Sequence, residues 1–128
     1  MSVLTGGSAA PIYDVTLDVV GTSSSAGVIA SIQNPFGVDA MIFNRALNVT
    51  TGSTGASSVD IGVAATAASS DTLIDGQAAN AIAVVTAVGT NGGPIRLWPA
   101  GYFVTIAEAS GDVAGLAARL HLECAPIA

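Results

Sequence analysis

The sequence predicts an all-β protein, an antiparallel β-sandwich of about eight strands with a jelly-roll-like arrangement. Apolar and polar residues alternate with a period of two along most of the 128 residues, which is typical of strands with one buried face. Turns rich in glycine, serine and asparagine separate these segments, and short strands linked in this way form a sandwich, a jelly roll or a small barrel. A helix after Ser70 is disfavoured, because Gly76 and a β-branched run follow it.

Four strands are expected in the first half of the chain, each with alternating faces. In YDVTLDVV, for example, Val15, Leu17 and Val19 share one face, whereas Asp14 and Asp18 lie on the other. The turns NPFGVD and GSTGAS separate later strands, because proline and glycine supply the backbone conformations that turns require. The four expected strands are 13–20, 27–33, 40–51 and 58–66.

The second half is expected to add four strands and one irregular loop. The loop is AASSDTLIDGQAAN, in which Asp75 and Gly76 form a tight turn, and Leu73 with Ile74 packs against the sandwich. The last two strands, GYFVTIAEA and GLAARLHLEC, are expected to pair as a hairpin across the turn SGDVA. The four expected strands are 81–89, 95–99, 101–109 and 115–124.

The chain is expected to form one β-sandwich domain, residues 11–128, after a flexible N-terminal arm, residues 1–10. A chain of this length can bury a core without disulfides or metal. The arm has no basic segment followed by an apolar run, so no secretion signal is expected. No apolar run approaches the ~18 residues of a spanning helix.

Charge and composition exclude some partners. The chain has nine acidic residues, three arginines and no lysine, for a net charge of −6. Nucleic acid and anionic membranes are therefore not expected as partners, because both attract clustered basic side chains. Only 9% of the residues are charged, and a surface of small neutral residues favours a chain that buries much of its outside against neighbours.

The only histidine and the only cysteine lie close together in LAARLHLEC. On a strand, Cys124 shares the face of Leu120, whereas His121 shares the face of Arg119 and Glu123. A Cys-His nucleophilic pair therefore cannot form from these neighbours, and zinc would need three or four ligands. We predict no catalytic residue, no metal ligand and no cofactor, and thus no enzyme.

Other site patterns are also weak. There is no G-x-S-x-G segment, and TNGGPI lacks the Gly-Lys-Ser/Thr ending of a phosphate-binding loop. Asp71 and Asp75 offer too few oxygens for a calcium site. The sequence therefore favours a structural or binding role.

Four residues are candidates for an interface: Arg45, Trp98, Pro99 and Tyr102. Arg45 interrupts an apolar face formed by Met41, Phe43, Leu47 and Val49, and needs a carboxylate or a subunit boundary there. The competing interpretation places it at an exposed strand end, paired with an aspartate. Tryptophan and tyrosine are enriched at interfaces. Alternatively, Trp98 covers one end of the sandwich, and Tyr102 fills a core position beside Phe103.

Three segments, VIASIQNPFGVDAMIFNRALNVTTGSTGASSVDIGVA, DTLIDG and GYFVTIAEASGDVAGLAARLHLE, resemble small head proteins of tailed phages over about residues 14 to 124. The similar chains share an Asn-Pro-type turn, an "NVTT" strand, a "LIDG" loop and a final "YVTVT…AGL" hairpin. The resemblance implies a capsid decoration or cement protein on the outer surface of the virion. It also implies the major capsid protein as partner and a homo-oligomer, a trimer or a dimer. The alternatives are a minor virion spike or fibre, or a receptor- or carbohydrate-binding module.

Overall fold

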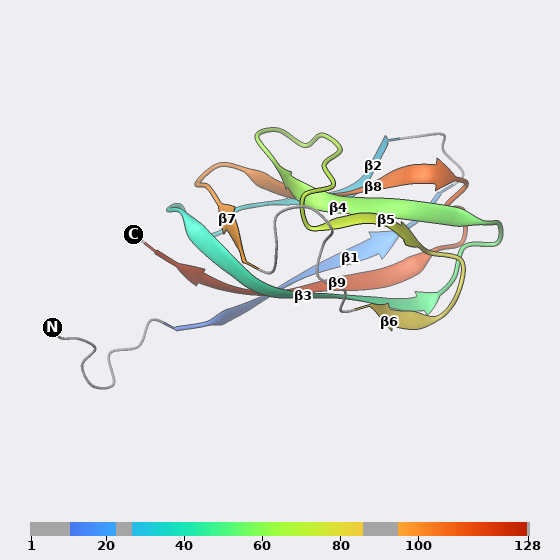
Figure 1. The fold of residues 1–128 in the computed structure, drawn as a ribbon, viewed down its shortest axis with the longest axis horizontal. Coiled ribbons are helices and arrows are strands. Elements are labelled where there is room, and N and C mark those ends of the chain that lie inside the picture. The colour runs from blue at the N-terminus through green and yellow to red at the C-terminus, as the bar shows by residue number, and fades with distance from the viewer. Residues whose placement is uncertain (1–10, 23–26, 86–94, 128) are drawn as a thin grey trace, which may run out of the picture.

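The computed structural model describes residues 11–22, 27–85 and 95–127, so the expected arm, residues 1–10, lies outside the described residues. The described residues contain no helix, and none that could span a membrane. They form two antiparallel sheets that pack face to face (Figure 1). The predicted all-β sandwich is therefore confirmed.

Nine strands are described, and most agree with the expected segments. The first three strands have the bounds that the alternation in the sequence predicts, because each of them ends at a polar turn. The strands are β1 Tyr13–Val20, β2 Gly27–Gln33, β3 Ala40–Thr51, β4 Ser57–Ala64, β5 Ile74–Ala78, β6 Ala83–Val85, β7 Arg96–Trp98, β8 Phe103–Gly111 and β9 Ala117–Pro126.

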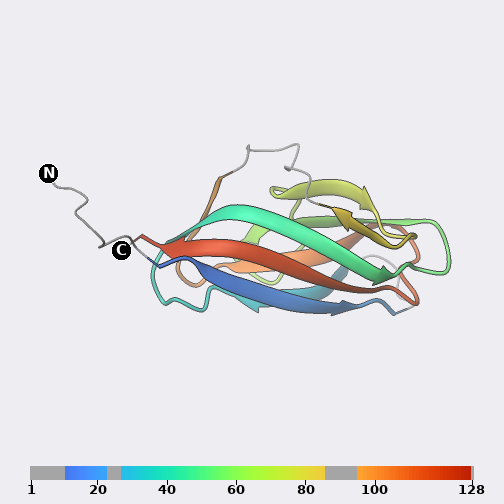
Figure 2. The same cartoon turned by 90° about the horizontal axis from the view of Figure 1, so that it is seen from below.

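The strand order is that of a jelly roll. Sheet A has the order β1-β9-β3-β6, with β7 also paired to β3, and sheet B has the order β2-β8-β4-β5. The pairs are nested: β4 with β5, β3 with β6 and β7, β2 with β8, and β1 with β9. Successive nested pairs alternate between the two sheets, which is the double-sheet winding of this fold. Figure 2 shows β1, β9 and β3 side by side in sheet A.

Strands β6 and β7 occupy the same place in the strand order of sheet A, because both pair with β3. β6 pairs with Leu47, Asn48 and Val49 of β3, whereas β7 pairs with Ala40 and its two successors at the other end of that strand. Of the expected strand 81–89, residues 83–85 form β6, residues 81–82 precede it outside any strand, and residues 86–89 lie outside the described residues.

The expected hairpin between the last two strands is wrong. β8 lies in sheet B between β2 and β4, and β9 lies in sheet A between β1 and β3. The connection crosses from one layer to the other, and Val113 and Leu116 within it are buried in the core. Alternation shows that each strand has a buried face, but two strands on opposite layers have the same pattern as a hairpin.

The segment expected to be a loop contains β5. Leu73 and Ile74 are buried as expected, but residues 74–78 pair with β4. Gly76 has a φ of +68°, and the β4–β5 register shifts between Val59 and Ile61. A bulge of this kind breaks the two-residue alternation, so the strand did not show in the sequence pattern.

The end of the sandwich that holds the β2–β3 turn is held together by Asn34. Its Nδ2 donates to the carbonyl oxygens of Val38 and Trp98, both at 2.9 Å. Its Oδ1 accepts from the backbone N–H of Phe36 at 2.7 Å. The Nε1 of Trp98 donates to the carbonyl oxygen of Tyr102, also at 2.9 Å. Turns from both halves of the chain are thereby fixed against each other.

A bulge in β3 changes which side chains of that strand face the core. The register with β9 shifts between Ile42 and Asn44, and Ile42 is buried while Phe43 is 39% exposed. Beyond the bulge, Leu47 and Val49 face the core as expected, and Arg45 joins them. The prediction that Met41 and Phe43 face the core is wrong, because one extra residue transfers a side chain to the opposite face.

Candidate functional site

The outer face of sheet A carries a polar centre made by three strands. β1, β9 and β3 lie next to one another, and their register places polar side chains in three rows, each half-buried or exposed. We call these residues the polar centre. Its rows are Asp14–Glu123–Asn44, Thr16–His121–Ala46 and Asp18–Arg119–Asn48.

Side-chain contacts connect the strands of the polar centre. The Nδ2 of Asn44 donates to Oε1 of Glu123 at 3.1 Å, and Nε of Arg119 pairs with Oδ1 of Asp18 at 2.7 Å. Both contacts are exposed to solvent, and an exposed ion pair contributes about 0–1 kcal/mol to stability. Shallow hollows lie on either side of His121. The polar centre is thus an open, hydrogen-bonding surface rather than an enclosed pocket.

Cys124 is separated from this surface, as the sequence predicts. Its side chain is fully buried on the inner face of β9, whereas His121 is exposed on the outer face. Burial, and then the negative charges of Asp14 and Glu123, raise the pKa of the Cys124 thiol to about 12. The residue is therefore a thiol at neutral pH, and it lacks the thiolate that a nucleophile or metal ligand needs.

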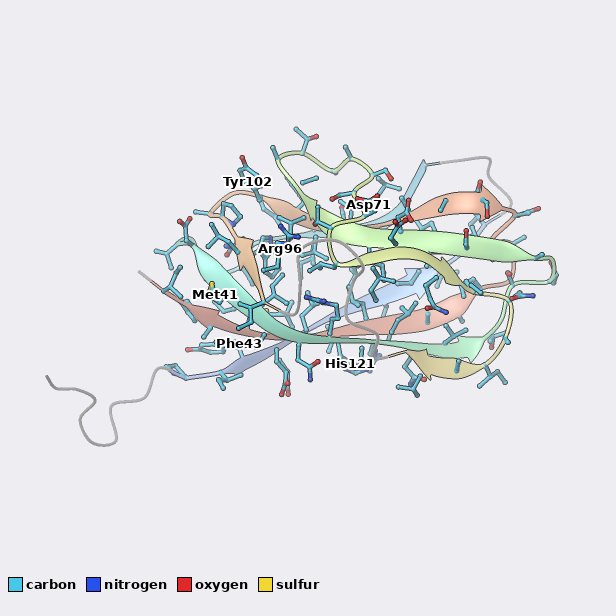
Figure 3. All side chains as sticks on the ribbon, viewed as in Figure 1. Met41, Phe43, Asp71, Arg96, Tyr102 and His121 are labelled. Carbon is cyan, nitrogen blue, oxygen red and sulfur yellow. The ribbon has the colours of Figure 1, made fainter. Side chains whose placement is uncertain are left out.

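No metal-binding group is found among the described residues. No three or more His, Cys, Asp or Glu side chains in residues 11–22, 27–85 and 95–127 are placed to hold an ion. Asp71 and Asp75, the pair weighed for calcium, lie before and within β5. Figure 3 shows Asp71 near sheet B and His121 at sheet A, on the other layer.

Arg45 lies inside the sandwich. Its side chain is only 2% exposed, so its expected place at an exposed strand end is wrong. Burial lowers the pKa of Arg45, and the positive charge of Arg96 lowers it further. Arg96 comes from β7, and its Nη2 donates to the carbonyl oxygen of Thr72 at 3.3 Å. Arg45 shares the inner face with Leu47 and Val49, as the alternation predicts, because all three lie beyond the β3 bulge.

Trp98 is also buried. It is fully enclosed in the core, and its ring meets Phe36 edge-on at a centroid distance of 6.5 Å. Pro99 is half-buried, and Tyr102 is exposed. Of the four candidate interface residues, only Pro99 and Tyr102 therefore reach the surface, and Trp98 covers the end of the sandwich from within.

A different surface was not predicted from the sequence. Beside the polar centre, toward the end where β1 begins and β9 ends, large apolar side chains lie on the outer face of sheet A. Figure 3 labels two of them, Met41 and Phe43, on β3. All are exposed except Met41, which is half-buried. We call them the apolar end patch. Its members are Ile12, Met41, Phe43, Ile95, Leu97 and Ile127.

Register places these residues together. Met41 is paired with Leu97 of β7 on one side and with Ala125 of β9 on the other. The backbone N–H of Ile127 donates to the carbonyl oxygen of Asp39 at 2.9 Å, next to this row. In the sequence, the patch was indicated only by single apolar residues at strand ends. The β3 bulge, which exposes Phe43, has no recognisable pattern in the sequence.

No family model, no curated protein and no solved structure matches this chain. Its function is therefore argued from its own fold and surfaces.

Proposed function

We propose that this protein is a non-enzymatic structural protein of a virus particle. In this proposal it is a decoration or cement protein that oligomerises and binds the outer capsid lattice, where it stabilises the head. The apolar end patch is the observation that carries the proposal, because the largest exposed apolar patch of a single chain is often a functional surface.

A role without catalysis is supported by the placement of the reactive side chains. The thiol of Cys124 is buried, and His121 lies on an open surface beside Thr16 and Ala46. A general base needs a substrate held at hydrogen-bonding distance, and a shallow face does not exclude water from such a substrate. The surface instead offers many small contacts.

Charge supports a place on the outside of a particle. The net charge of −6, with no lysine, disfavours binding to packaged nucleic acid and keeps the chain soluble before it binds. A symmetric shell repeats one modest interface many times, so strong attachment of an oligomer does not require a large contact per chain.

The segments that resemble phage head proteins have structural roles here. In NPFGVD, Asn34 fixes the turn, and in LIDG, Leu73 and Ile74 are buried before the left-handed Gly76. The resemblance thus concerns residues that build the sandwich. It supports a shared fold, from which the decoration role is proposed.

The test is quantitative mass spectrometry of density-purified virus particles from the source, with the chain counted against the major capsid protein. A ratio near one, or a simple fraction of it, is the expected result. A few copies per particle would replace this proposal with a spike or fibre, and complete absence from particles would overturn a virion role. A glycan array with the purified chain would then test the adhesion alternative.

A further inference from the structure

We propose that a second copy of this chain binds the apolar end patch, so that two sheets A meet face to face about a two-fold axis. The inference deepens the proposed function, on which it rests for the expectation of an oligomer, by naming the surface and the partner. Residues of β3, β7 and the end of β9 would form the contact.

The patch is continuous across the sheet. Met41 lies between Leu97 and Ala125 in one row, and Ile12 directly precedes Tyr13, which is paired with Cys124. Ile42 is paired with Arg96, and one position beyond this pair Phe43 follows Ile42 on β3 and Ile95 precedes Arg96 of β7. The six side chains therefore form one surface rather than scattered exposed residues.

The size of the patch suits the centre of a protein interface. Its exposed members range from Phe43, 39% exposed, to Ile12, 64% exposed. Together they present on the order of 400 Å² of apolar surface, which is within the range of functional patches on single chains. A standard interface buries roughly 800 Å² on each partner, so the patch would supply about half and the polar surroundings the rest.

The lack of charge on the apolar end patch permits contact with a second copy, and the charge beside the patch fixes how the two copies overlap. In a two-fold contact each surface meets its own image, so the surface must complement itself. The apolar end patch contains no ionisable side chain, whereas the neighbouring polar centre contains Asp14, Asp18 and Glu123 against Arg119 alone. Two acidic centres would repel each other, so the copies can overlap only at their apolar ends, with the polar centres pointing away in opposite directions.

The contact is tested by sedimentation of the purified full chain over a wide range of concentrations. The wild-type chain is expected to be a dimer and Leu97→Asp a monomer, since the substitution buries a charge at the centre of the contact. Val84→Asp is the matched control, because Val84 is also an exposed apolar residue on a short edge strand paired with β3, at the other end of sheet A. It is expected to remain a dimer.

A second variant guards against misfolding of the first. Ile127→Asp changes a side chain that lies beyond β9 and is 53% exposed, so unfolding is not expected. Circular dichroism and the melting temperature of each variant show whether the sandwich is intact. A folded Ile127→Asp monomer supports the contact, whereas a folded Ile127→Asp dimer that matches wild type at every concentration overturns it.

Failure of this inference and failure of the proposed function give different results. A dimer that is absent from virus particles would retain the inference and overturn the virion role. A monomer at all concentrations would overturn the inference, and loss of particle binding by Leu97→Asp would then assign the patch to the capsid lattice. Equal dissociation of Val84→Asp would also overturn it, because the effect would not be specific to the patch.

Discussion

The side-chain amide of Asn34 donates a hydrogen bond to the backbone carbonyl of Trp98 at 2.9 Å, across 64 residues of sequence. The same amide nitrogen also donates to the backbone carbonyl of Val38, and the indole N–H of Trp98 donates to the backbone carbonyl of Tyr102. Asn34 and Trp98 are both buried, so these bonds are shielded from water. They hold the turn between β2 and β3 against the turn between β7 and β8.

Replacing Asn34 with alanine is expected to destabilise the protein strongly. The substitution leaves the buried carbonyl of Trp98 and the partly buried N–H of Phe36 without their partner, at a cost of roughly 2–4 kcal/mol. Urea denaturation measures the change. Gln33→Ala is the control, since Gln33 is exposed and makes one side-chain bond to Gly101, and its effect is expected to be about 0.5 kcal/mol or less. Equal effects of the two variants would contradict the role given to Asn34.

Trp98 provides a direct probe of the core. It is the only tryptophan of the chain, and its side chain is fully buried. A collisional quencher such as acrylamide is therefore expected to reduce native fluorescence only weakly, and strongly after unfolding in urea. Strong quenching of the native chain would show that Trp98 is accessible and would return it to the set of candidate interface residues.

Stability is expected to fall at alkaline pH because of Cys124. The thiol pKa is raised from 9.0 to about 12 in the folded chain, so the unfolded chain loses this proton first. Below pH 9 both states keep the proton, and between pH 9 and about 12 ionisation of the unfolded state favours unfolding. Urea denaturation of wild type and Cys124→Ala at several pH values isolates this contribution. The wild-type chain should lose more stability above pH 9 than the variant, and parallel curves would contradict the raised pKa.

Gly62→Ala is expected to destabilise the sandwich. A Cβ at this position would clash with Oγ of Ser70 and would lie 2.6 Å from the backbone nitrogen of Thr72, because the segment before β5 crosses directly over β4. Overpacking of this kind costs about 1–3 kcal/mol. Gly55→Ala is the control, since nothing lies within 4 Å of its Cβ position. A thermal melt compares the two variants, and a Gly62→Ala chain as stable as Gly55→Ala would exclude the close crossing.

The fold was largely predictable because alternation reports burial directly. The inner row of Leu120, Leu122 and Cys124, and the outer row of Arg119, His121 and Glu123, are found as expected. Pairing was less predictable, since β8 and β9 have the pattern of a hairpin and yet belong to different layers. Pairing depends on how the chain winds, which local alternation does not encode.

The candidate surfaces were predicted only in part. The polar centre follows from the outer rows of β1 and β9, because Asp14, Asp18 and His121 are exposed on regular strands. The apolar end patch depends on the β3 bulge, which turns Phe43 to the outer face and Ile42 to the inner one. A bulge of one residue reverses both faces after it, and no turn residue marks it in the sequence.

The winding of the chain sets the order in which the protein can be completed during synthesis. β9 is the last strand along the described chain, yet it lies between β1 and β3 in sheet A and pairs with both. During synthesis, β1 therefore cannot pair until its partner has been made, about 100 residues later. Pairing between such distant residues is slow, and folding is expected in the range of roughly milliseconds to seconds. Until β9 emerges from the ribosome, β1 and β3 lack the strand that joins them, and their apolar inner faces are exposed. This is the period in which chaperones have their main opportunity to bind the nascent chain.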